Sequence, residues 1–266
     1  VGYKLYITTE TMISSHLGDH SSFWVHTAVR ENSIDLYGFK TVQLTGGYKA
    51  YRNWVLAQFE KNYSMKVLGG YTGSGKTEIL LQLQKSKIPV IDLEGLANHK
   101  GSAFGALGQN EQDSQEQFEN NLAEALFNIS TLHPSFWVED ESQRIGTNML
   151  PMQFFKNLRN SVCYFIDIPF ESRLNFIVQG YGKFPVADLI AATLRIQKRL
   201  GGLETKTAVN LFVENNIEGA FSILLKYYDK VYLKNVETAS IPKFKIEKIE
   251  APEVHPIENA GRLMHL

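Results

Sequence analysis

The chain has 266 residues, of which 44% are hydrophobic and 12% aromatic, so it can bury a sizeable core and is not a disordered protein. Its 27 basic and 28 acidic residues leave a net charge of −1, so any contact with nucleic acid must come from a local basic patch. The single cysteine, Cys163, excludes an internal disulfide and a four-cysteine zinc site. No run approaches the roughly 20 apolar residues of a membrane span, and the first residues lack a signal-peptide pattern, so we expect a soluble, cytoplasmic protein without a membrane partner.

The first 52 residues predict a short, irregular segment with strands at 21–26 and 40–44. A helical pattern follows over residues 48–63, and we expect residues 53–63 of it to form a linker helix. The apolar face of this helix consists of Tyr51, Val55 and Phe59.

Residues 64–234 alternate strand and helix signals. The predicted strands are 65–70, 89–95, 135–142 and 162–169. The predicted helices are 76–87, one that begins at Ser114, 151–160, 185–200 and 218–230. Repeated βα units predict an α/β fold in which helices cover both faces of a parallel sheet. Residues 235–266 carry three prolines among alternating charges, so we expect a C-terminal surface tail with one edge strand at 243–249.

Residues 70–77, GYTGSGKT, match the phosphate-binding pattern G-x-x-x-x-G-K-[ST], or Walker A motif, between a predicted strand and a predicted helix. Glycines let the backbone turn tightly so that successive N–H groups point at an anion, and the helix N-terminus adds partial positive charge. We expect Lys76 to reach the terminal phosphates and Thr77 to bind Mg²⁺. The fold is therefore expected to be P-loop NTPase-like. The predicted phosphate-binding residues are Gly70, Gly73, Ser74, Gly75, Lys76 and Thr77.

The loop needs an acidic partner, and three acids follow the apolar residues of the strand at 135–142. Strand alternation prevents all three carboxylates from entering one site. We predict that Asp140 binds Mg²⁺ and that Glu141 positions a water molecule or a neighbouring group, with Lys76 completing the catalytic set. The alternative is that these acids end a strand in solvent.

Other residues are candidates for substrate binding. Asp92 and Glu94, two apart on a predicted strand, share a face and can look into the same crevice. His99 and Lys100 lie on a glycine-bearing loop beside this site. For all four, an ordinary solvated loop is the alternative.

Basic residues gather further along the chain. Between residues 183 and 206, five basic residues stand against two acidic ones. Arg173, Arg195 and Arg199 are predicted to clamp phosphates or an RNA backbone, and a solvated helix face is the alternative. Cys163 has apolar neighbours in its strand, which favours a buried small hydrophobe over a nucleophile.

Five segments resemble the tRNA 2-selenouridine synthase family, in order and at compatible spacing, over about residues 40–205. They are LGGYTGSGKTEILLQL, VIDLEGLANHKGSAFG, SQEQFENNLAEAL, WVEDESQRIG and KRLGG. The second is much more specific than the phosphate loop itself. The family joins an N-terminal rhodanese-like domain to a C-terminal P-loop domain, and LYGFKTVQLTGGYKAYRNW resembles the end of such a rhodanese domain. Where its cysteine loop would lie, this chain reads FWVHTAVRENSIDLYGFK, without cysteine. We therefore expect residues 1–52 to be an incomplete rhodanese-like segment.

The resemblance implies a transferase that modifies the wobble 2-thiouridine of tRNA. Geranyl diphosphate would S-geranylate the base, and selenium from selenophosphate would then replace the sulfur. A P-loop suits such an enzyme without a kinase reaction, because both co-substrates carry phosphate groups. Two alternatives are a P-loop small-molecule or nucleoside kinase and a non-catalytic nucleotide- or RNA-binding module. A kinase would need an acceptor-site signature, and the sequence shows none.

Overall fold

The computed structural model describes residues 5–7, 12–14, 40–42, 45–238 and 245–266, with side chains described for 45–232 and 245–266. It contains two compact units, Val1–Glu60 and Lys61–Leu266. Each unit is described by itself.

In the first unit, β1 (Leu5–Ile7), β2 (Met12–Ser14) and β3 (Lys40–Val42) form an antiparallel sheet in the order β1-β2-β3. Helix α2 (Gly47–Phe59) follows and buries the predicted face of Tyr51, Val55 and Phe59. The expected boundary at residue 52 was wrong, because α2 continues through it and the unit ends at Glu60. The predicted strand at 21–26 lies outside the described residues, and the rhodanese-like assignment stays a prediction.

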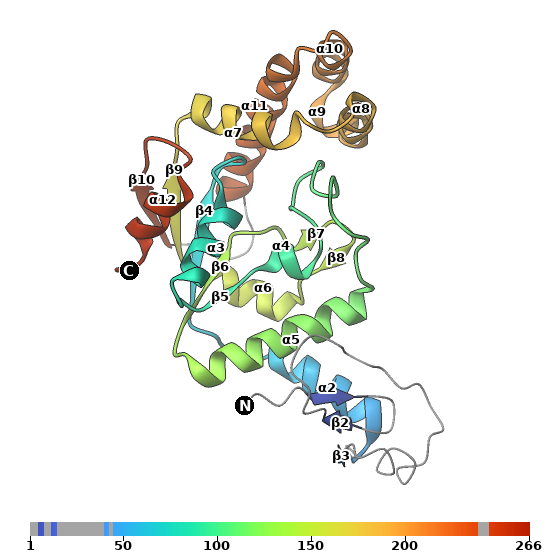
Figure 1. The fold of residues 1–266 in the computed structure, drawn as a ribbon, viewed down its shortest axis with the longest axis vertical. Coiled ribbons are helices and arrows are strands. Elements are labelled where there is room, and N and C mark those ends of the chain that lie inside the picture. Colours follow the sequence, from blue (N-terminus) through green and yellow to red (C-terminus); the bar gives the residue numbers. More distant parts are fainter. Residues whose placement is uncertain (1–4, 8–11, 15–39, 43–44, 239–244) are drawn as a thin grey trace. The chain divides into compact units, whose positions relative to one another are not determined.

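The second unit is built on a five-stranded sheet in which every neighbouring pair is parallel (Figure 1). Its strands are β4 (Met65–Gly70), β5 (Val90–Ile91), β6 (Phe136–Glu139), β9 (Val162–Asp167) and β10 (Lys245–Glu250). The spatial order β10-β9-β4-β6-β5 confirms the predicted α/β class. The chain leaves β4 for strands on one side and later adds strands on the other, so β4 ends at the point where ligands bind in open α/β sheets.

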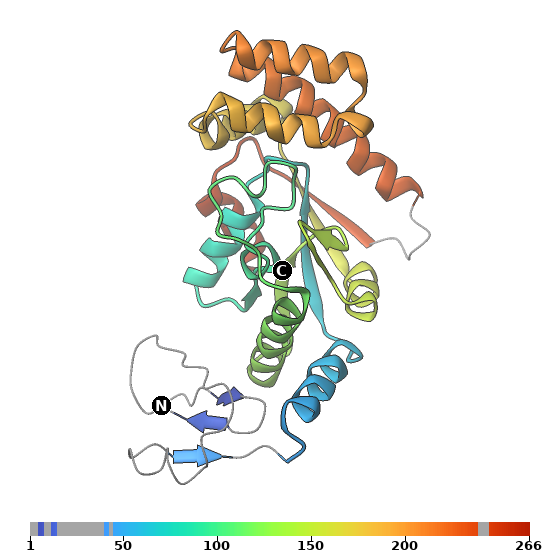
Figure 2. The same ribbon diagram turned by 90° about the vertical axis from the view of Figure 1, so that its right-hand side faces the viewer.

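Helices cover both faces of this sheet, as predicted. On one face, α3 (Lys76–Lys85) and α12 (Pro256–Leu263) pack against each other and against the buried strand residues Leu68, Trp137 and Ile166. Helix α6 (Met152–Arg159) lies on the opposite side of the sheet (Figure 2). The three central strands, β4, β6 and β9, are apolar along most of their length, which is typical of strands buried on both faces.

Short elements connect the central strands. Helix α4 (Leu93–Leu96) follows β5 directly, and α5 (Gln115–Leu132) begins after Ser114, whose hydroxyl accepts a hydrogen bond from the Gln117 N–H as the predicted N-cap. The strands β7 (Arg144–Ile145) and β8 (Asn148–Met149) form a small hairpin after β6. Across the described residues, every helix is too short or too polar to cross a membrane.

A helical subdomain lies beyond the carboxyl ends of the strands (Figures 1 and 2). It consists of α7 (Phe170–Tyr181), α8 (Val186–Arg195), α9 (Gln197–Leu200), α10 (Gly202–Val213) and the first half of α11 (Ile217–Thr238). Its core contains Leu174, Leu189, Phe212, Phe221 and Leu224, all buried. Phe104 from the loop after α4 packs into the same core, so this subdomain is tied to the loop beside the phosphate site.

The expectation of a C-terminal surface tail was wrong for residues 245–266. The predicted edge strand exists as β10, but it pairs with β9 along all six of its residues. Helix α12 then buries Ala260 and Leu263 against α3. Pro256 did not signal a loop, because it occupies the first turn of α12, where a proline costs no helical hydrogen bond.

Candidate phosphate-binding site

The P-loop lies where the sequence predicted it, between β4 and α3. Gly73 and Gly75 adopt φ angles of 81° and 72°, which side chains rarely tolerate. A Cβ at Gly73 would also lie 2.7 Å from Ile177 Cδ1, and a Cβ at Gly75 would lie 2.8 Å from Val254 Cγ1. Both glycines are therefore required by the backbone conformation and by the surrounding packing.

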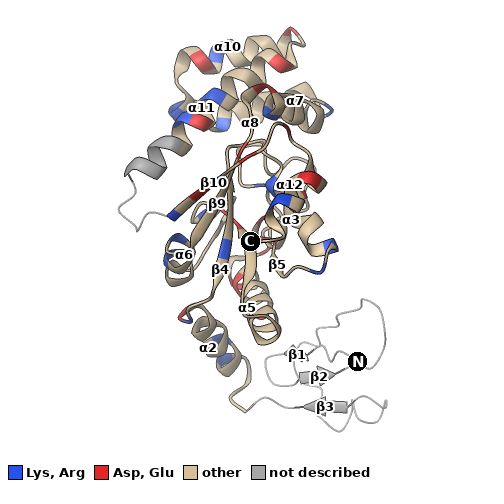
Figure 3. Cartoon of the chain, turned by 90° about the vertical axis from the view of Figure 1, so that its left-hand side faces the viewer, with Lys and Arg blue, Asp and Glu red and all other residues tan. Residues whose placement is uncertain are grey.

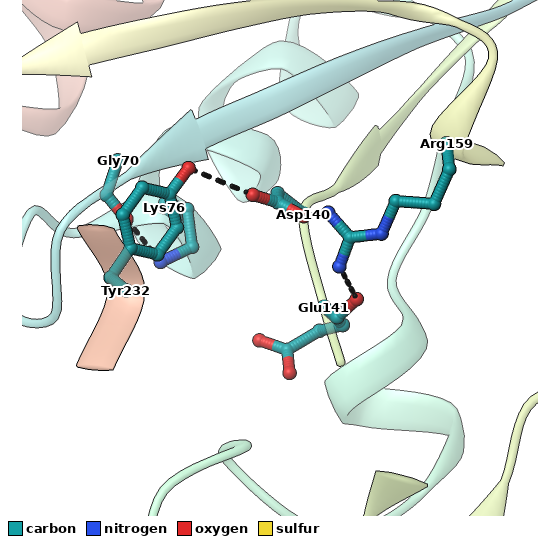
Figure 4. A network of polar contacts seen from close by, with 6 residues as sticks. All are labelled: Gly70, Lys76, Asp140, Glu141, Arg159 and Tyr232. Atoms are coloured by element: carbon teal, nitrogen blue, oxygen red, sulfur yellow. Dashed lines mark hydrogen bonds and ion pairs between the residues drawn. The ribbon is translucent and has the colours of Figure 1, made fainter. Parts of the chain in front are cut away.

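Two side chains of the loop fit the predicted anion site. Lys76 Nζ donates a hydrogen bond to the Gly70 carbonyl at 3.2 Å, so the ammonium group lies within the loop (Figure 4). Ser74 is 1% exposed, and its hydroxyl has no hydrogen-bond partner among the described residues. A buried polar atom without a partner is costly, and a bound phosphate oxygen would supply one.

Three glutamates lie beside the loop and form what we term the carboxylate cluster, Glu94, Glu139 and Glu141. Thr77 Oγ1 donates to Glu94 Oε2 at 2.7 Å, and the Glu94 N–H donates to Glu139 Oε1 at 2.7 Å. Gly101 closes the cluster from outside, because a Cβ there would lie 2.7 Å from Glu141 Oε2 and 2.8 Å from Glu94 Oε1.

Burial raises the pKa of every carboxyl group in the cluster. The pKa of Glu139 is well above its ordinary value because of burial, then because of the negative charges of Asp92 and Glu94. Burial and Glu94 likewise raise the pKa of Glu141. Burial also raises the pKa of Glu94, although the Lys76 ammonium opposes the shift. The cluster therefore favours either a bound proton or a nearby cation.

Asp140, between two members of the cluster, faces the other way. Its Oδ1 forms a 2.8 Å ion pair with Arg159 Nη1, and its Oδ2 accepts a hydrogen bond from the Tyr232 hydroxyl at 3.0 Å (Figure 4). Arg159 Nη2 also donates to the Glu141 carbonyl at 3.0 Å. Strand alternation thus separates the acids as expected. That Asp140 binds the metal stays a prediction, while the Thr77 hydroxyl contacts Glu94.

Asp92 was expected to share a strand face with Glu94, and this was wrong. The Asp92 carboxylate accepts a hydrogen bond from the Gly95 N–H at 2.7 Å and so forms the N-cap of α4, which contains Glu94. The negative charge of Asp92 still influences the site, because it raises the pKa of Glu139. Its role in substrate binding stays a prediction.

The loop after α4 carries two other candidates. His99 Nδ1 is buried without a hydrogen-bond partner among the described residues, and burial, then the charge of Arg195, lowers the pKa of its imidazole. Lys100 is exposed. Arg195 thus acts on His99 through its charge, while its guanidinium bonds to the Ala103 carbonyl of the same loop.

The three predicted arginines have different surroundings. Arg173 is 3% exposed and forms a bidentate pair with Asp229, at 2.9 Å through Nη1 and 2.8 Å through Nη2. Arg195 Nη2 donates to the Ala103 carbonyl at 3.0 Å, and Arg199 is exposed. Arg173 is thus committed to internal contacts, and Arg195 to the loop that covers the site.

A groove runs between α8, α9 and α10 on the helical subdomain. Its walls consist of Leu194, Gln197, Lys198, Gly202, Thr205, Lys206, Val209 and Asn210. Acidic and basic residues are interspersed over this part of the molecule (Figure 3). The two lysines are therefore the only local source of positive charge within the groove lining.

A family model described as the tRNA 2-selenouridine synthase AAA domain matches residues 63–247. The chain belongs to the tRNA 2-selenouridine synthase family. A tRNA 2-selenouridine synthase of Shewanella frigidimarina (strain NCIMB 400) is 33% identical over 79% of this chain and 63% of that protein. Another, of Sulfurovum sp. (strain NBC37-1), is 34% identical over 75% of this chain and 62% of that protein. The chain therefore spans less than two thirds of the length of these curated relatives.

Two further comparisons gave matches, one to a family model and one to a solved structure. A model described as the RuvA N terminal domain matches residues 1–38, of which the structure describes only β1 and β2. Among solved structures, a sugar kinase from Janibacter sp. HTCC2649 is 15% identical, with a TM-score of 0.34 over 76% of this chain and 95% of that chain. So low a similarity carries no argument about function.

Several residues of the site carry no local sequence signal. From the sequence we predicted Asp140, and not its neighbour Glu139, beside the loop. Strand alternation separates these acids, but it does not determine which of them face the loop. Arg159, Asp229 and Tyr232 lie in helices and look like ordinary amphipathic positions. Only the three-residue spacing of Asp229 and Tyr232, which puts both on one helix face, hints at a shared partner.

Proposed function

We propose that this chain is the phosphate-binding part of a transferase that modifies the wobble 2-thiouridine of tRNA. The observation that supports it is a complete P-loop beside a buried carboxylate cluster, in a chain of the tRNA 2-selenouridine synthase family. In the proposed reaction, geranyl diphosphate alkylates the sulfur, and selenium from selenophosphate then replaces it. The sulfur leaves as geranylthiol, and water cleaves the Se–P bond so that phosphate is released. Both co-substrates carry the phosphate groups that a P-loop binds.

In the first step, the sulfur of 2-thiouridine bonds to C1 of the geranyl group while the C1–O bond to diphosphate breaks. The diphosphate leaves with the bonding electrons, and the uridine loses its N3 proton. Lys76 and the N–H groups of the loop neutralise the leaving group. We assign the proton to the carboxylate cluster, because carboxyl groups with raised pKa values suit a proton acceptor near neutral pH.

Magnesium fits the residues beside the loop. The Thr77 hydroxyl and the Glu94 carboxylate lie together, and oxygen donors are the ligands that Mg²⁺ prefers. In the described part of the chain, no three His, Cys, Asp or Glu side chains are placed to hold an ion by themselves. This suits Mg²⁺, which typically uses one or two carboxylates together with phosphate oxygens and water. Bound there, the ion would neutralise charge on the departing diphosphate.

Cys163 is not assigned any step. The thiol is buried within β9, and burial raises its pKa far above the ordinary value, so it lacks the thiolate that sulfur or selenium transfer needs. We therefore expect geranylation to be the more robust half-reaction of this chain, because alkylation needs only a bound leaving group and an aligned sulfur nucleophile.

The proposal is tested by incubating the chain with 2-thiouridine-containing tRNA, geranyl diphosphate and Mg²⁺, without ATP. Digestion and mass spectrometry should detect an S-geranylated nucleoside, which Lys76→Ala should abolish. Turnover of ATP on a small-molecule acceptor without any modified nucleoside would identify a kinase. Binding of tRNA without turnover of either kind would identify a non-catalytic module.

A further inference from the structure

One helix outside the Walker A motif contacts two residues that lie beside the P-loop. Helix α11 presents Asp229 and Tyr232 on one face, three residues apart. Asp229 binds both terminal nitrogens of Arg173, and the Tyr232 hydroxyl donates to Asp140 Oδ2 at 3.0 Å. Each of these partners touches the loop or the strand beside it.

The first contact runs through the Arg173 guanidinium. While Asp229 holds this group bidentately, Nη1 also donates to the Thr72 carbonyl at 3.0 Å and Nε donates to the Ile168 carbonyl at 3.0 Å. A planar guanidinium held on two sides has a fixed orientation. The Thr72 carbonyl therefore points toward Arg173, and because the peptide unit is planar and trans, the Gly73 N–H points away from Arg173.

The second contact confines Tyr71, the residue after Gly70. The centre of its ring lies 5.5 Å from the centre of the Tyr232 ring and 5.0 Å from the centre of the Phe165 ring, and both contacts are edge to face. The Arg173 guanidinium lies 4.9 Å from the centre of the same ring. Aromatic and cation–π contacts of this kind restrict the position of the ring, and here they hold it on three sides.

The other end of α11 belongs to a different part of the unit. Phe221, Leu224 and Leu225 are buried in the core of the helical subdomain. Leu224 and Tyr232 are eight residues apart, which is about 12 Å along a helix. A continuous helix therefore joins the packing of the helical subdomain to the backbone of the phosphate loop.

We infer that Asp229 and Tyr232 are positioning residues that hold Tyr71 and Thr72 in the conformation that binds diphosphate, and that α11 couples this loop to the helical subdomain. The inference rests on the proposed function, because it takes diphosphate to be the group that the loop binds. A preorganised loop binds its anion more tightly, since no ordering cost remains at the moment of binding. Coupling between two sites is reciprocal, so an occupied loop also steadies α11.

The test measures binding of inorganic diphosphate with Mg²⁺ by titration calorimetry to the whole chain. Asp229→Asn weakens the hold on Arg173, and Tyr232→Phe releases the ring that packs on Tyr71 from its hydrogen bond to Asp140. Each variant should lower the affinity by about 5- to 30-fold, in the usual range of coupling between sites. Tyr227→Phe is the matched control, because it removes a hydroxyl from the same helix that makes no hydrogen bond to any described residue. It should leave the affinity unchanged.

Hydrogen exchange separates positioning from a general loss of structure. Diphosphate should slow amide exchange in residues 70–77 and in α11 of the wild-type chain. In Asp229→Asn the loop should still respond, while α11 should not. If Asp229→Asn does not fold, Tyr232→Phe, which keeps the ring, supplies the same comparison.

The outcomes are distinct. Unchanged affinity in both variants, or no response of α11 in the wild-type chain, would overturn the inference and leave the proposed function standing. A wild-type chain that does not bind diphosphate would overturn the proposed function and, with it, the inference.

Discussion

Lys76 is the only charged side chain among residues 70–77, and its ammonium group already lies inside the loop. Lys76→Ala should weaken diphosphate binding by about 10- to 150-fold, because a charge-assisted hydrogen bond is worth about 1.5–3 kcal/mol. Titration calorimetry gives this ratio directly. Lys85→Ala removes the same charge from the exposed far end of α3 and should bind normally. Wild-type affinity in a folded Lys76→Ala protein would contradict the anion site.

Glu139 makes the stability of the fold depend on pH. Its pKa is raised on folding, so the folded chain holds this proton more tightly than the unfolded chain. Stability should therefore fall as pH rises from the unfolded pKa of about 4.3 towards the higher folded pKa. Glu139→Gln removes the titration and should be more stable than the wild type near pH 8, by on the order of 1 kcal/mol, and similar near pH 4.

Urea denaturation over this pH range, without divalent cations, measures the difference. The exposed Glu214→Gln should change neither the stability nor its slope with pH. If Glu139→Gln and the wild type lose stability in parallel as pH rises, the carboxylate cluster is not the cause of the pH dependence.

At the scale of elements, we predict that the groove on the helical subdomain contacts an RNA backbone. Lys198 and Lys206 line it, whereas Arg195 is already engaged with the Ala103 carbonyl. Lys198→Glu with Lys206→Glu should weaken tRNA binding and flatten its dependence on salt by about 0.7–0.9 units of slope for each phosphate that the protein no longer neutralises. Lys85→Glu with Lys156→Glu makes the same charge change on exposed helices elsewhere. An equal effect of both pairs would mean that only net charge matters.

The strongly periodic elements could be predicted from sequence, and weaker ones could not. The capping pattern at Ser114 and the apolar faces of α2, α3 and α5 are local, so they predict these helices correctly. Apolar residues before Asp92 favour a strand at this position, but its side chain caps a helix instead. Helices α7 and α10 were not predicted separately, since they are defined by tertiary packing in the helical subdomain.

The same limit applies to the site. The P-loop is a contiguous motif whose glycines are set by backbone geometry, so eight residues sufficed to predict it. Which acids face it depends on the register of two strands, in which Leu68 pairs with Glu139. Asp229, which orients Arg173 towards the loop, lies far along the chain, and no local pattern links such residues. Contacts of that range appear only when the fold is complete.

At the scale of the whole molecule, the last helix completes the core of the second unit. Leu263 is 1% exposed and packs with α3, so Leu263→Ala should lower the free energy of unfolding by about 2–5 kcal/mol. Denaturant unfolding measures this, and the neighbouring Met264→Ala, at a half-exposed position, should cost much less. Equal small effects would mean that α12 is dispensable for stability.

The P-loop lies near the start of the second unit in sequence, and residues that pack against it lie near the end of that unit. Gly75 packs beneath Val254, and β10 covers the outer edge of β9, although about 180 residues separate Gly75 from Val254. A ribosome adds about 5–20 residues per second, so a growing chain carries its finished loop for roughly 10–40 s before that support emerges. One surface of α3 has no partner until α12 has been made, and the edge of β9, once that strand exists, has no partner until β10 follows. We therefore expect the nascent chain to expose an unpaired strand edge that chaperones can shield, and to bind diphosphate only after Val254 has been made.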